Sequence, residues 1–195
     1  MEQGGSSLDL DRSKTALVVI DLQKGIAGRQ TAPHDCATVV ANAARLADAF
    51  RASKMPVFLV RFVASDADRL RPIADEQPWR AGGAPPEDFA EFVPELEPRE
   101  GDIVIGKKQW GAFYGTELDL QLRRRRIETI VLCGIATNYG VESTARFAYE
   151  YGYQQVFVSD AMAAMSAEAH DGALRYTFAR IGRVRTTAQV LDGLR

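Results

Sequence analysis

Charged residues close two apolar runs of this chain, and their types suit proton transfer. Asp21 ends the run "TALVVID" and Lys107 ends the run "DIVIGK". A carboxyl group can give or take a proton, and a nearby ammonium group stabilises the carboxylate that results. If the fold brings the two side chains together, they form a site for general acid–base chemistry.

A third feature lies in the stretch "LCGIATNYGVESTARFAYEYGY", residues 132–153. Its pattern predicts the end of a buried strand, a turn bounded by glycines, and then a helix. Backbone amides at a helix start can hold an anion or a developing oxyanion. An α/β enzyme often places a nucleophilic Cys or Ser here, but this chain has Gly140. The pattern therefore leaves two possibilities, an active site that has lost its nucleophile or one that never needed it.

Apolar runs alternate with helical patterns along the chain, and the alternation defines the fold class. The predicted strands cover residues 15–21, 56–62, 102–107, 128–134, 154–160 and 182–186. The predicted helices cover residues 35–54, 117–126, 138–151 and 168–180, with a short one at the end. Strands that are apolar on both faces favour a sheet covered by helices on both sides. We expect an α/β, three-layer Rossmann-like fold with a mainly parallel sheet of about six strands.

The chain reads as one domain. Residues 1–14 are polar and rich in Gly and Ser, so we expect a loose N-terminal segment followed by a single domain over residues 15–195. The connection over residues 63–101 is long and includes "QPWRAGGAPPEDF", where Trp79 and Arg80 are candidates to close over a ligand. Connections of that length are usually functional.

Composition excludes several classes of function. The net charge is −2 over 195 residues, and no apolar run has membrane-spanning length, so we expect neither a nucleic-acid nor a membrane partner. The chain has two cysteines, whose spacing does not indicate a disulfide framework, and this pattern suits the reducing cytoplasm. Its two histidines are far apart in the sequence and do not have the spacing of metal ligands. The run Arg123–Arg126 has two interpretations, a solvated helix end or a phosphate site, and the first is favoured.

In an open parallel sheet, ligands bind beyond the carboxyl ends of the strands, so residues there are candidate pocket residues. Gln23 could face the site or cap a loop, and Phe113 could wall the pocket or pack in the core. Arg61 ends the second strand and could bind a substrate carboxylate or form a surface ion pair. Trp110 could also wall the pocket, and Tyr139 could contact substrate or another subunit.

Four blocks of the sequence together resemble the isochorismatase-like hydrolases, also called the cysteine hydrolase superfamily. The blocks are "VVIDLQ", "GKKQWGAFYGT", "VLCGIATNYGVESTARFAYEYGY" and "VSDAMAAMS", in that order between residue 15 and about residue 166. The resemblance implies a shared Asp, Lys and Cys constellation in which Asp21 and Lys107 match the first two. The family's nucleophilic Cys maps onto Gly140.

The same resemblance implies further properties. A non-proline cis peptide is expected at Ile135–Ala136, with the Ala136 amide turned toward an oxyanion. We expect a small-molecule substrate, no cofactor, no metal and a homo-oligomer. The zinc-binding histidines of nicotinamidases are absent.

The isochorismatases proper also have Gly in place of Cys and cleave a vinyl ether, in which the family aspartate protonates the enol carbon and water traps the oxocarbenium ion. We therefore expect a hydrolase that acts on a small carboxylate-bearing metabolite, with Asp21 as general acid or base and Lys107 as its electrostatic partner. Lys107 should lower the pKa of Asp21, whereas an acid role near neutral pH requires a raised pKa. Two alternatives remain: a retired scaffold that binds a small molecule, and amide hydrolysis through activated water. In the turn, Ala136 and Asn138 replace the aromatic residue and the His of true isochorismatases.

Overall fold

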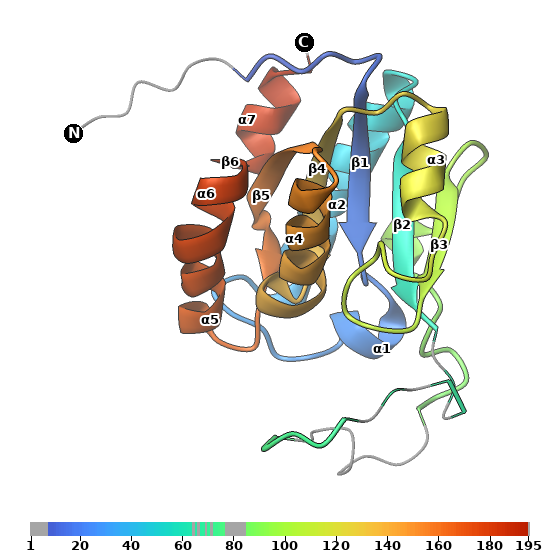
Figure 1. The fold of residues 1–195 in the computed structure, drawn as a ribbon, viewed down its shortest axis with the longest axis vertical. Helices are drawn as coiled ribbons and strands as arrows, with labels where there is room; N and C mark the ends of the chain where they lie inside the picture. Colours follow the sequence, from blue (N-terminus) through green and yellow to red (C-terminus); the bar gives the residue numbers. More distant parts are fainter. Residues whose placement is uncertain are drawn as a thin grey trace.

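A computed structural model describes residues 8–194 except residues 64, 66, 69, 71 and 77–84. The described residues form a parallel sheet of six strands in the order β3-β2-β1-β4-β5-β6 (Figure 1). The strands are β1 (Thr15–Ile20), β2 (Val57–Phe62), β3 (Ile103–Lys107), β4 (Thr129–Ile135), β5 (Gln154–Ala163) and β6 (Arg183–Arg185). The chain reverses its direction of travel across the sheet between β1 and β4, and ligands bind at such a switch point in open α/β sheets.

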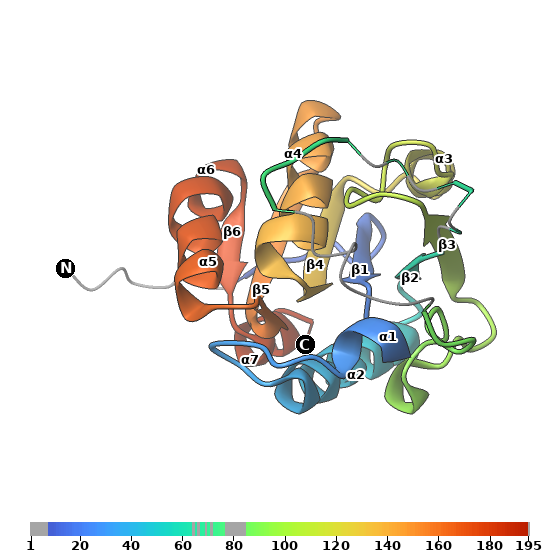
Figure 2. The same cartoon turned by 90° about the horizontal axis from the view of Figure 1, so that it is seen from below.

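Helices cover both faces of the sheet, as the two-sided apolar strands predict. The α-helices are α1 (Lys24–Ala27), α2 (Cys36–Ala52), α3 (Leu118–Arg124), α4 (Glu142–Glu150), α5 (Ala167–Gly172), α6 (Ala179–Ile181) and α7 (Thr187–Asp192). Three further helical segments are η2 (Pro94–Leu96) and the π-helical η3 (Thr137–Val141) and η4 (Ala173–Phe178). Figure 2 shows α1, α2 and α7 on one side of the sheet and α3, α4, α5 and α6 on the other.

Strand alternation divides the core into two parts. On β1, Leu17 and Val19 pack against α2 and α7, whereas Val18 and Ile20 pack against α3 and α4. Every residue of β1 is buried, because side chains of a central strand with helices on both faces have no route to solvent. β1 therefore ends inside the protein, and its last residues enter the site with little freedom.

The structure confirms most predicted elements and corrects three of them. Asp35 caps α2 by accepting a 2.7 Å hydrogen bond from the Thr38 amide, as the N-cap pattern indicates. β5 continues three residues past its predicted end, to Ala163. The predicted helix over residues 138–151 divides into η3 and α4, and the one over residues 168–180 divides into α5, η4 and α6.

The prediction of a loose segment over residues 1–14 is wrong for its described part. Leu8 and Leu10 are buried and join the core beside α2 and α7. Arg12 donates a hydrogen bond to the Leu194 carbonyl at the other end of the chain. The polar composition of the segment hid two leucines that pack under α7.

Candidate active site

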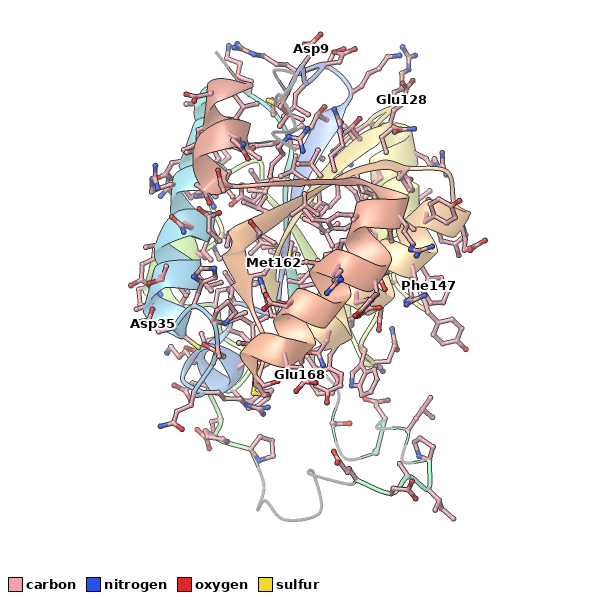
Figure 3. The ribbon with its side chains drawn as sticks, turned by 90° about the vertical axis from the view of Figure 1, so that its left-hand side faces the viewer. Asp9, Asp35, Glu128, Phe147, Met162 and Glu168 are labelled. Atoms are coloured by element: carbon pink, nitrogen blue, oxygen red, sulfur yellow. The ribbon has the colours of Figure 1, made fainter. Side chains whose placement is uncertain are left out.

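The carboxyl ends of the strands, the amino ends of α2 and α5 and the turn η3 gather at one end of the molecule. In Figure 1 the arrow of β1 points to this end, and in Figure 3 Asp35 and Glu168 mark the starts of α2 and α5 there. Asp9 and Glu128 lie at the opposite end. The predicted acid, base and glycine turn all belong to this one end.

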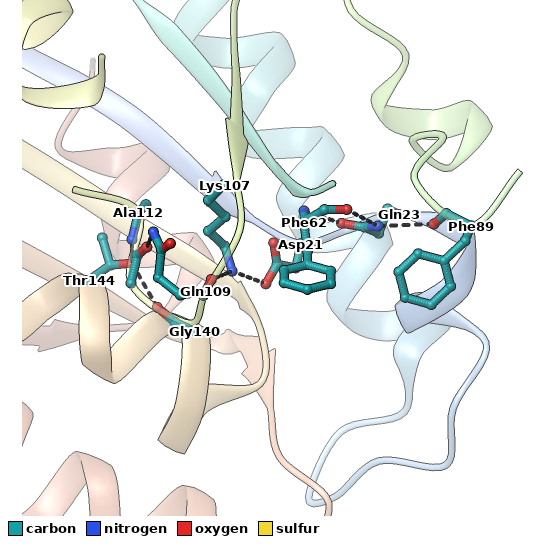
Figure 4. A network of polar contacts seen from close by, with 10 residues as sticks. Asp21, Gln23, Phe62, Phe89, Lys107, Gln109, Ala112, Gly140 and Thr144 are labelled. Atoms are coloured by element: carbon teal, nitrogen blue, oxygen red, sulfur yellow. Dashed lines mark hydrogen bonds and ion pairs between the residues drawn. The ribbon is translucent and has the colours of Figure 1, made fainter. Parts of the chain in front are cut away.

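Asp21 and Lys107 form a buried ion pair. Lys107 Nζ lies 2.7 Å from Asp21 Oδ2, and the two side chains are 2% and 7% exposed. Lys107 Nζ also donates to the Gln109 carbonyl at 3.0 Å, and its position lies 5.8 Å from the centre of the Phe62 ring (Figure 4). The sequence therefore placed the two groups at one rim correctly.

The backbone at Asp21 is in an unusual conformation. Its φ is 55°, in the left-handed region that non-glycine residues rarely adopt. Its amide still donates to the Val60 carbonyl at 2.9 Å, so the strand ladder holds the residue there. Unfavourable backbone geometry of this kind clusters at functional sites, where the surrounding structure enforces it.

Burial decides the protonation of Asp21. Loss of hydration raises the pKa of the Asp21 carboxyl to about 6, although the charge and hydrogen bond of Lys107 act in the opposite direction. Among the described residues, Oδ1 of this carboxyl has no hydrogen-bond partner although it is buried. The two oxygens of Asp21 therefore differ, since one is bound to Lys107 and the other has no partner among the described residues.

Gly140 lies directly against this carboxyl. A side-chain carbon built on Gly140 would be 3.1 Å from Asp21 Oδ2, 3.1 Å from Ile20 Cγ2 and 3.5 Å from the Trp110 carbonyl. The position that the family resemblance assigns to a nucleophile therefore faces the carboxylate. Asp21, Lys107 and Gly140 meet as the sequence predicts.

Two hydrogen bonds of Thr144 fix the C-terminal end of the turn η3. Thr144 Oγ1 donates to the Gly140 carbonyl at 2.7 Å and accepts from the Ala112 amide at 3.0 Å (Figure 4). These bonds join η3 to the segment that follows Lys107. Trp110 belongs to that segment, and its ring centre is 4.7 Å from that of Tyr139.

The turn itself has the predicted backbone. The Ile135–Ala136 peptide bond is cis, as the resemblance implies. The Ala136 carbonyl accepts from the amides of Tyr139 and Val141 at 3.1 and 3.2 Å. The role of the Ala136 amide as an oxyanion donor stays a prediction.

The structure separates Arg61 from the pair. Its neighbours on β2, Val60 and Phe62, share the face of Lys107, whereas Arg61 points to the α2 side of the sheet by strand alternation. There it donates to the Ala90 carbonyl at 3.2 Å and lines a groove of about 370 Å³. A direct contact between Arg61 and a substrate at Asp21 is therefore not supported, and a strand-end position alone could not show which face the side chain takes.

The side chains of Gln23 and Phe113 bond to and pack against other parts of the protein. The Gln23 amide donates to the carbonyls of Phe62 and Phe89 at 3.1 and 2.9 Å and accepts from the Phe62 amide at 2.7 Å. These bonds favour its interpretation as a loop cap. Phe113 is 4% exposed, packs edge-on against Tyr151 and stacks on Tyr153, which favours core packing.

Other residues of the sequence analysis also have defined places. Cys133 is fully buried on β4, and burial raises the pKa of its thiol to about 12, so it is an inert core residue. Trp79 and Arg80 lie outside the described residues. The described residues contain no group of three potential metal ligands from His, Cys, Asp and Glu.

One site contact was missed because it joins residues far apart in the sequence. His170 of α5 is 2% exposed, and its Nδ1 lies 2.9 Å from Thr137 Oγ1 at the start of η3. The ring of His34 packs edge-on against His170 at 5.9 Å between centres. Histidines separated by more than a hundred residues give no spacing signal, so only the fold reveals them.

Comparison with known proteins gives a consistent picture. The chain matches the isochorismatase domain family over residues 15–189. It is 52% identical over 189 residues to the isochorismatase family protein YwoC of Bacillus subtilis, which covers 96% of this chain and 97% of YwoC. The structure of an isochorismatase family protein from Burkholderia thailandensis is 45% identical, with a TM-score of 0.89 over 97% of this chain and 99% of the other.

A more distant structural neighbour is an amidase. N-carbamoylsarcosine amidase from Thermoplasma acidophilum is 31% identical, with a TM-score of 0.70 over 89% of this chain and 96% of the amidase.

No helix among the described residues is long and apolar enough to cross a membrane.

Proposed function

Because this chain belongs to the isochorismatase family of hydrolases, we propose that it hydrolyses a small metabolite without a covalent enzyme intermediate. Gly140 offers no side-chain nucleophile, so water must be the group that attacks. Asp21 supplies the proton transfer, and Lys107 stabilises its carboxylate. One observation carries this proposal: a buried carboxyl with a pKa of about 6 keeps Oδ1 without a partner among the described residues and faces Gly140.

The raised pKa of Asp21 supports an acid role and so a vinyl-ether substrate. Below about pH 6 the carboxyl is protonated, and its proton can pass from Oδ1 to the enol carbon of the substrate. Water then adds to the oxocarbenium carbon and loses a proton, and the adduct breaks down to a carbonyl compound and an alcohol. The proton lost by water restores Asp21, so the cycle needs no other reagent.

Amide hydrolysis through activated water is the second candidate, and the likeness to N-carbamoylsarcosine amidase favours it. Here the ionised form of Asp21 takes a proton from water, which attacks the acyl carbon. The C–N bond then breaks, and the departing nitrogen takes that proton from Asp21. The two reactions require opposite starting protonation states of the same carboxyl. The pH dependence of turnover therefore distinguishes them.

The charge near the site limits how a substrate carboxylate could be bound. Lys107 already contacts Asp21 and the Gln109 carbonyl, and Arg61 lies on the other face of the sheet. Lys108 forms a surface ion pair with Asp68 at 2.9 Å. Of Lys107, Lys108 and Arg61, only Lys107 is therefore placed to bind a substrate carboxylate at the site.

A panel assay tests the proposal. Isochorismate and other enol ethers are assayed for pyruvate release, and amides and N-carbamoyl compounds for ammonia release. Asp21→Asn and Lys107→Met should lower kcat/KM about 10²–10⁴-fold, the usual contribution of a general acid or base. Lys108→Met is the matched control and should retain activity, because its ion pair is exposed.

Two outcomes would reject the proposal. Turnover that Asp21→Asn leaves unchanged would remove the assigned role of the carboxyl. Saturable binding of a panel compound without any turnover would favour a retired scaffold that serves as a small-molecule binder. Circular dichroism of each variant shows whether a lost activity reflects a lost fold.

We also propose that the protein forms a homo-oligomer, as the family resemblance implies. Large aromatic side chains lie exposed on and beside α4, including Trp110, Tyr139, Phe147 and Tyr149. Light scattering should give a mass that is a multiple of the 21.4 kDa chain. A mass equal to one chain at micromolar concentration would contradict this proposal.

A further inference from the structure

The turn that carries Gly140 is anchored at its start by a side chain from a different helix. Thr137 begins η3, and its Oγ1 lies 2.9 Å from Nδ1 of His170 on α5. Thr137 is 0% exposed and His170 is 2% exposed, so water cannot replace either partner. Removing one group would leave the other buried without a partner, which typically costs about 1–3 kcal/mol.

The other end of η3 has a different kind of anchor. Thr144 Oγ1, on the adjoining helix α4, donates to the Gly140 carbonyl one helical turn earlier. This bond and the Ala112 amide fix the exit of the turn relative to its neighbours. The bond between Thr137 and His170 links the entrance of the turn to α5.

The environment of His170 keeps its ring neutral. Burial, followed by the charge of His34, lowers the pKa of His170, and Asp171 opposes this weakly. His34 packs edge-on against the His170 ring at 5.9 Å between ring centres. A neutral, closely packed imidazole is suited to hold one hydrogen bond in a constant direction.

We infer that His170 is a positioning residue: through Thr137 it sets the place of Gly140 relative to the carboxyl of Asp21. This inference rests on the proposed function, since it concerns the same site. The clearance there is small, because a carbon on Gly140 would stand only 3.1 Å from Asp21 Oδ2. A shift of the turn would change which atoms can stand beside the carboxyl, and misplacements of about 1 Å can cost about 10²-fold in rate.

Paired substitutions test the inference through turnover. Thr137→Val and His170→Leu remove the bond, whereas Thr137→Ser and His170→Asn retain a hydroxyl and a group in the place of Nδ1. We expect the first two to lower kcat at least tenfold with a smaller change in KM, and the second two to recover most of it. The double variant Thr137→Val/His170→Leu should be no slower than either single one.

A second readout does not depend on turnover. In a Cys36→Ser background, the thiol introduced by Gly140→Cys is alkylated with iodoacetamide, and Cys133 is too buried to react. Adding Thr137→Val or His170→Leu should change the alkylation rate at least threefold, and adding Thr137→Ser or His170→Asn should not. If His170→Leu does not fold, His170→Gln replaces it, because its amide reaches past the place of Nδ1.

The two readouts separate failure of the inference from failure of the proposed function. An alkylation rate that all four variants leave unchanged would overturn the inference, whatever the substrate panel shows. An altered rate together with a silent panel would sustain the positioning role and reject the proposed hydrolysis. The inference would also be overturned if Thr137→Ser and His170→Asn do not recover the lost kcat. His170 would then be a general packing residue.

Discussion

At the scale of single residues, Asp21 is subject to two opposing effects. Lys107 is 2.7 Å away and favours the charged form, whereas burial favours the neutral form and prevails. The sequence could show that a cation stands nearby but not how completely the pair is desolvated. That second quantity decides whether Asp21 begins the reaction as an acid or as a base.

The pH dependence of kcat/KM should therefore show one limb near pH 6. If Asp21 acts as the acid, kcat/KM is constant below about pH 6 and falls tenfold per pH unit above it. If Asp21 activates water, the profile is reversed. The residual activity of Asp21→Asn should show no change of kcat/KM with pH near pH 6. If the pH dependence persists in this variant, it comes from another titrating group.

The same pKa has a consequence for stability. The native carboxyl titrates near pH 6 and the unfolded one near its ordinary value of 3.8, so between these values the native state binds more protons. The free energy of unfolding contributed by Asp21 should therefore fall as the pH rises from about 4 to about 6. Urea titrations of the wild type and of Asp21→Asn across this range measure it as the difference between their two pH dependences.

Gly140 should resist any larger side chain. In Gly140→Ala, the new carbon would press on Asp21 Oδ2, which Lys107 holds, and on Ile20, which is fully buried. We expect this variant to lose about 1 kcal/mol of unfolding free energy, since the overpacking penalty of about 1–3 kcal/mol exceeds the helix propensity gained. Urea denaturation measures it, and equal or greater stability would show that the site is roomier than the structure indicates.

Gly140→Cys adds a chemical probe at the same position. If the pocket fits an acyl substrate, mass spectrometry of this variant after incubation with amides should reveal an acyl adduct on the new thiol. Gly140→Ala is the matched control, because it adds the carbon without the sulfur. Absence of any adduct across the panel would count against the amide candidate.

At the scale of elements, most of the fold was predictable because buried strands and amphipathic helices have distinct periods. The strand over residues 15–20 is apolar after Thr15 and wholly buried, and the helix beginning at Cys36 has a clear N-cap and a regular buried stripe. The π-helical character of η3 and η4 was not predictable, because it follows from packing against the sheet. The face taken by Arg61 likewise depends on register, which a strand-end position does not reveal.

Resemblance and residue chemistry predicted different parts of the site. The residue pattern placed Asp21, Lys107 and the turn with Gly140 at one rim, and the family resemblance added the cis peptide at Ile135–Ala136. Neither revealed the bond between Thr137 and His170, because it joins two elements across the fold. Long-range contacts of this kind appear only when the packing of α5 on η3 is known.

Gln23 shows how one side chain can join three elements. It bonds to both backbone groups of Phe62 at the end of β2 and to the carbonyl of Phe89 in the long connection. Gln23→Leu would remove these three part-buried hydrogen bonds, so we expect a loss of about 1–3 kcal/mol in unfolding free energy. Gln154→Leu, at an exposed position, should have little effect. A raised KM with unchanged stability would instead restore a substrate-binding role for Gln23.

At the scale of the whole molecule, the two ends of the chain stabilise each other. Leu8 and Leu10 enter the core beside α2 and α7, and the backbone of Leu8 lies against Gly193 so closely that a side-chain carbon there would clash. Arg12 adds a hydrogen bond to Leu194. The segment before β1 therefore closes the core at the end of the sheet opposite the candidate site.

Truncating Leu10 should consequently destabilise the entire domain without changing the chemistry. Leu10 is 5% exposed, and Leu→Ala changes in a core cost about 2–5 kcal/mol, because the transfer free energy is lost and a cavity remains. Leu10→Ala should therefore lower the urea midpoint while kcat/KM of the folded fraction stays at its wild-type value. Leu120→Ala, 56% exposed on α3, is the matched control and should leave both quantities unchanged. A midpoint that Leu10→Ala does not move would mean that residues 8–14 pack only loosely in solution, as their polar composition predicts.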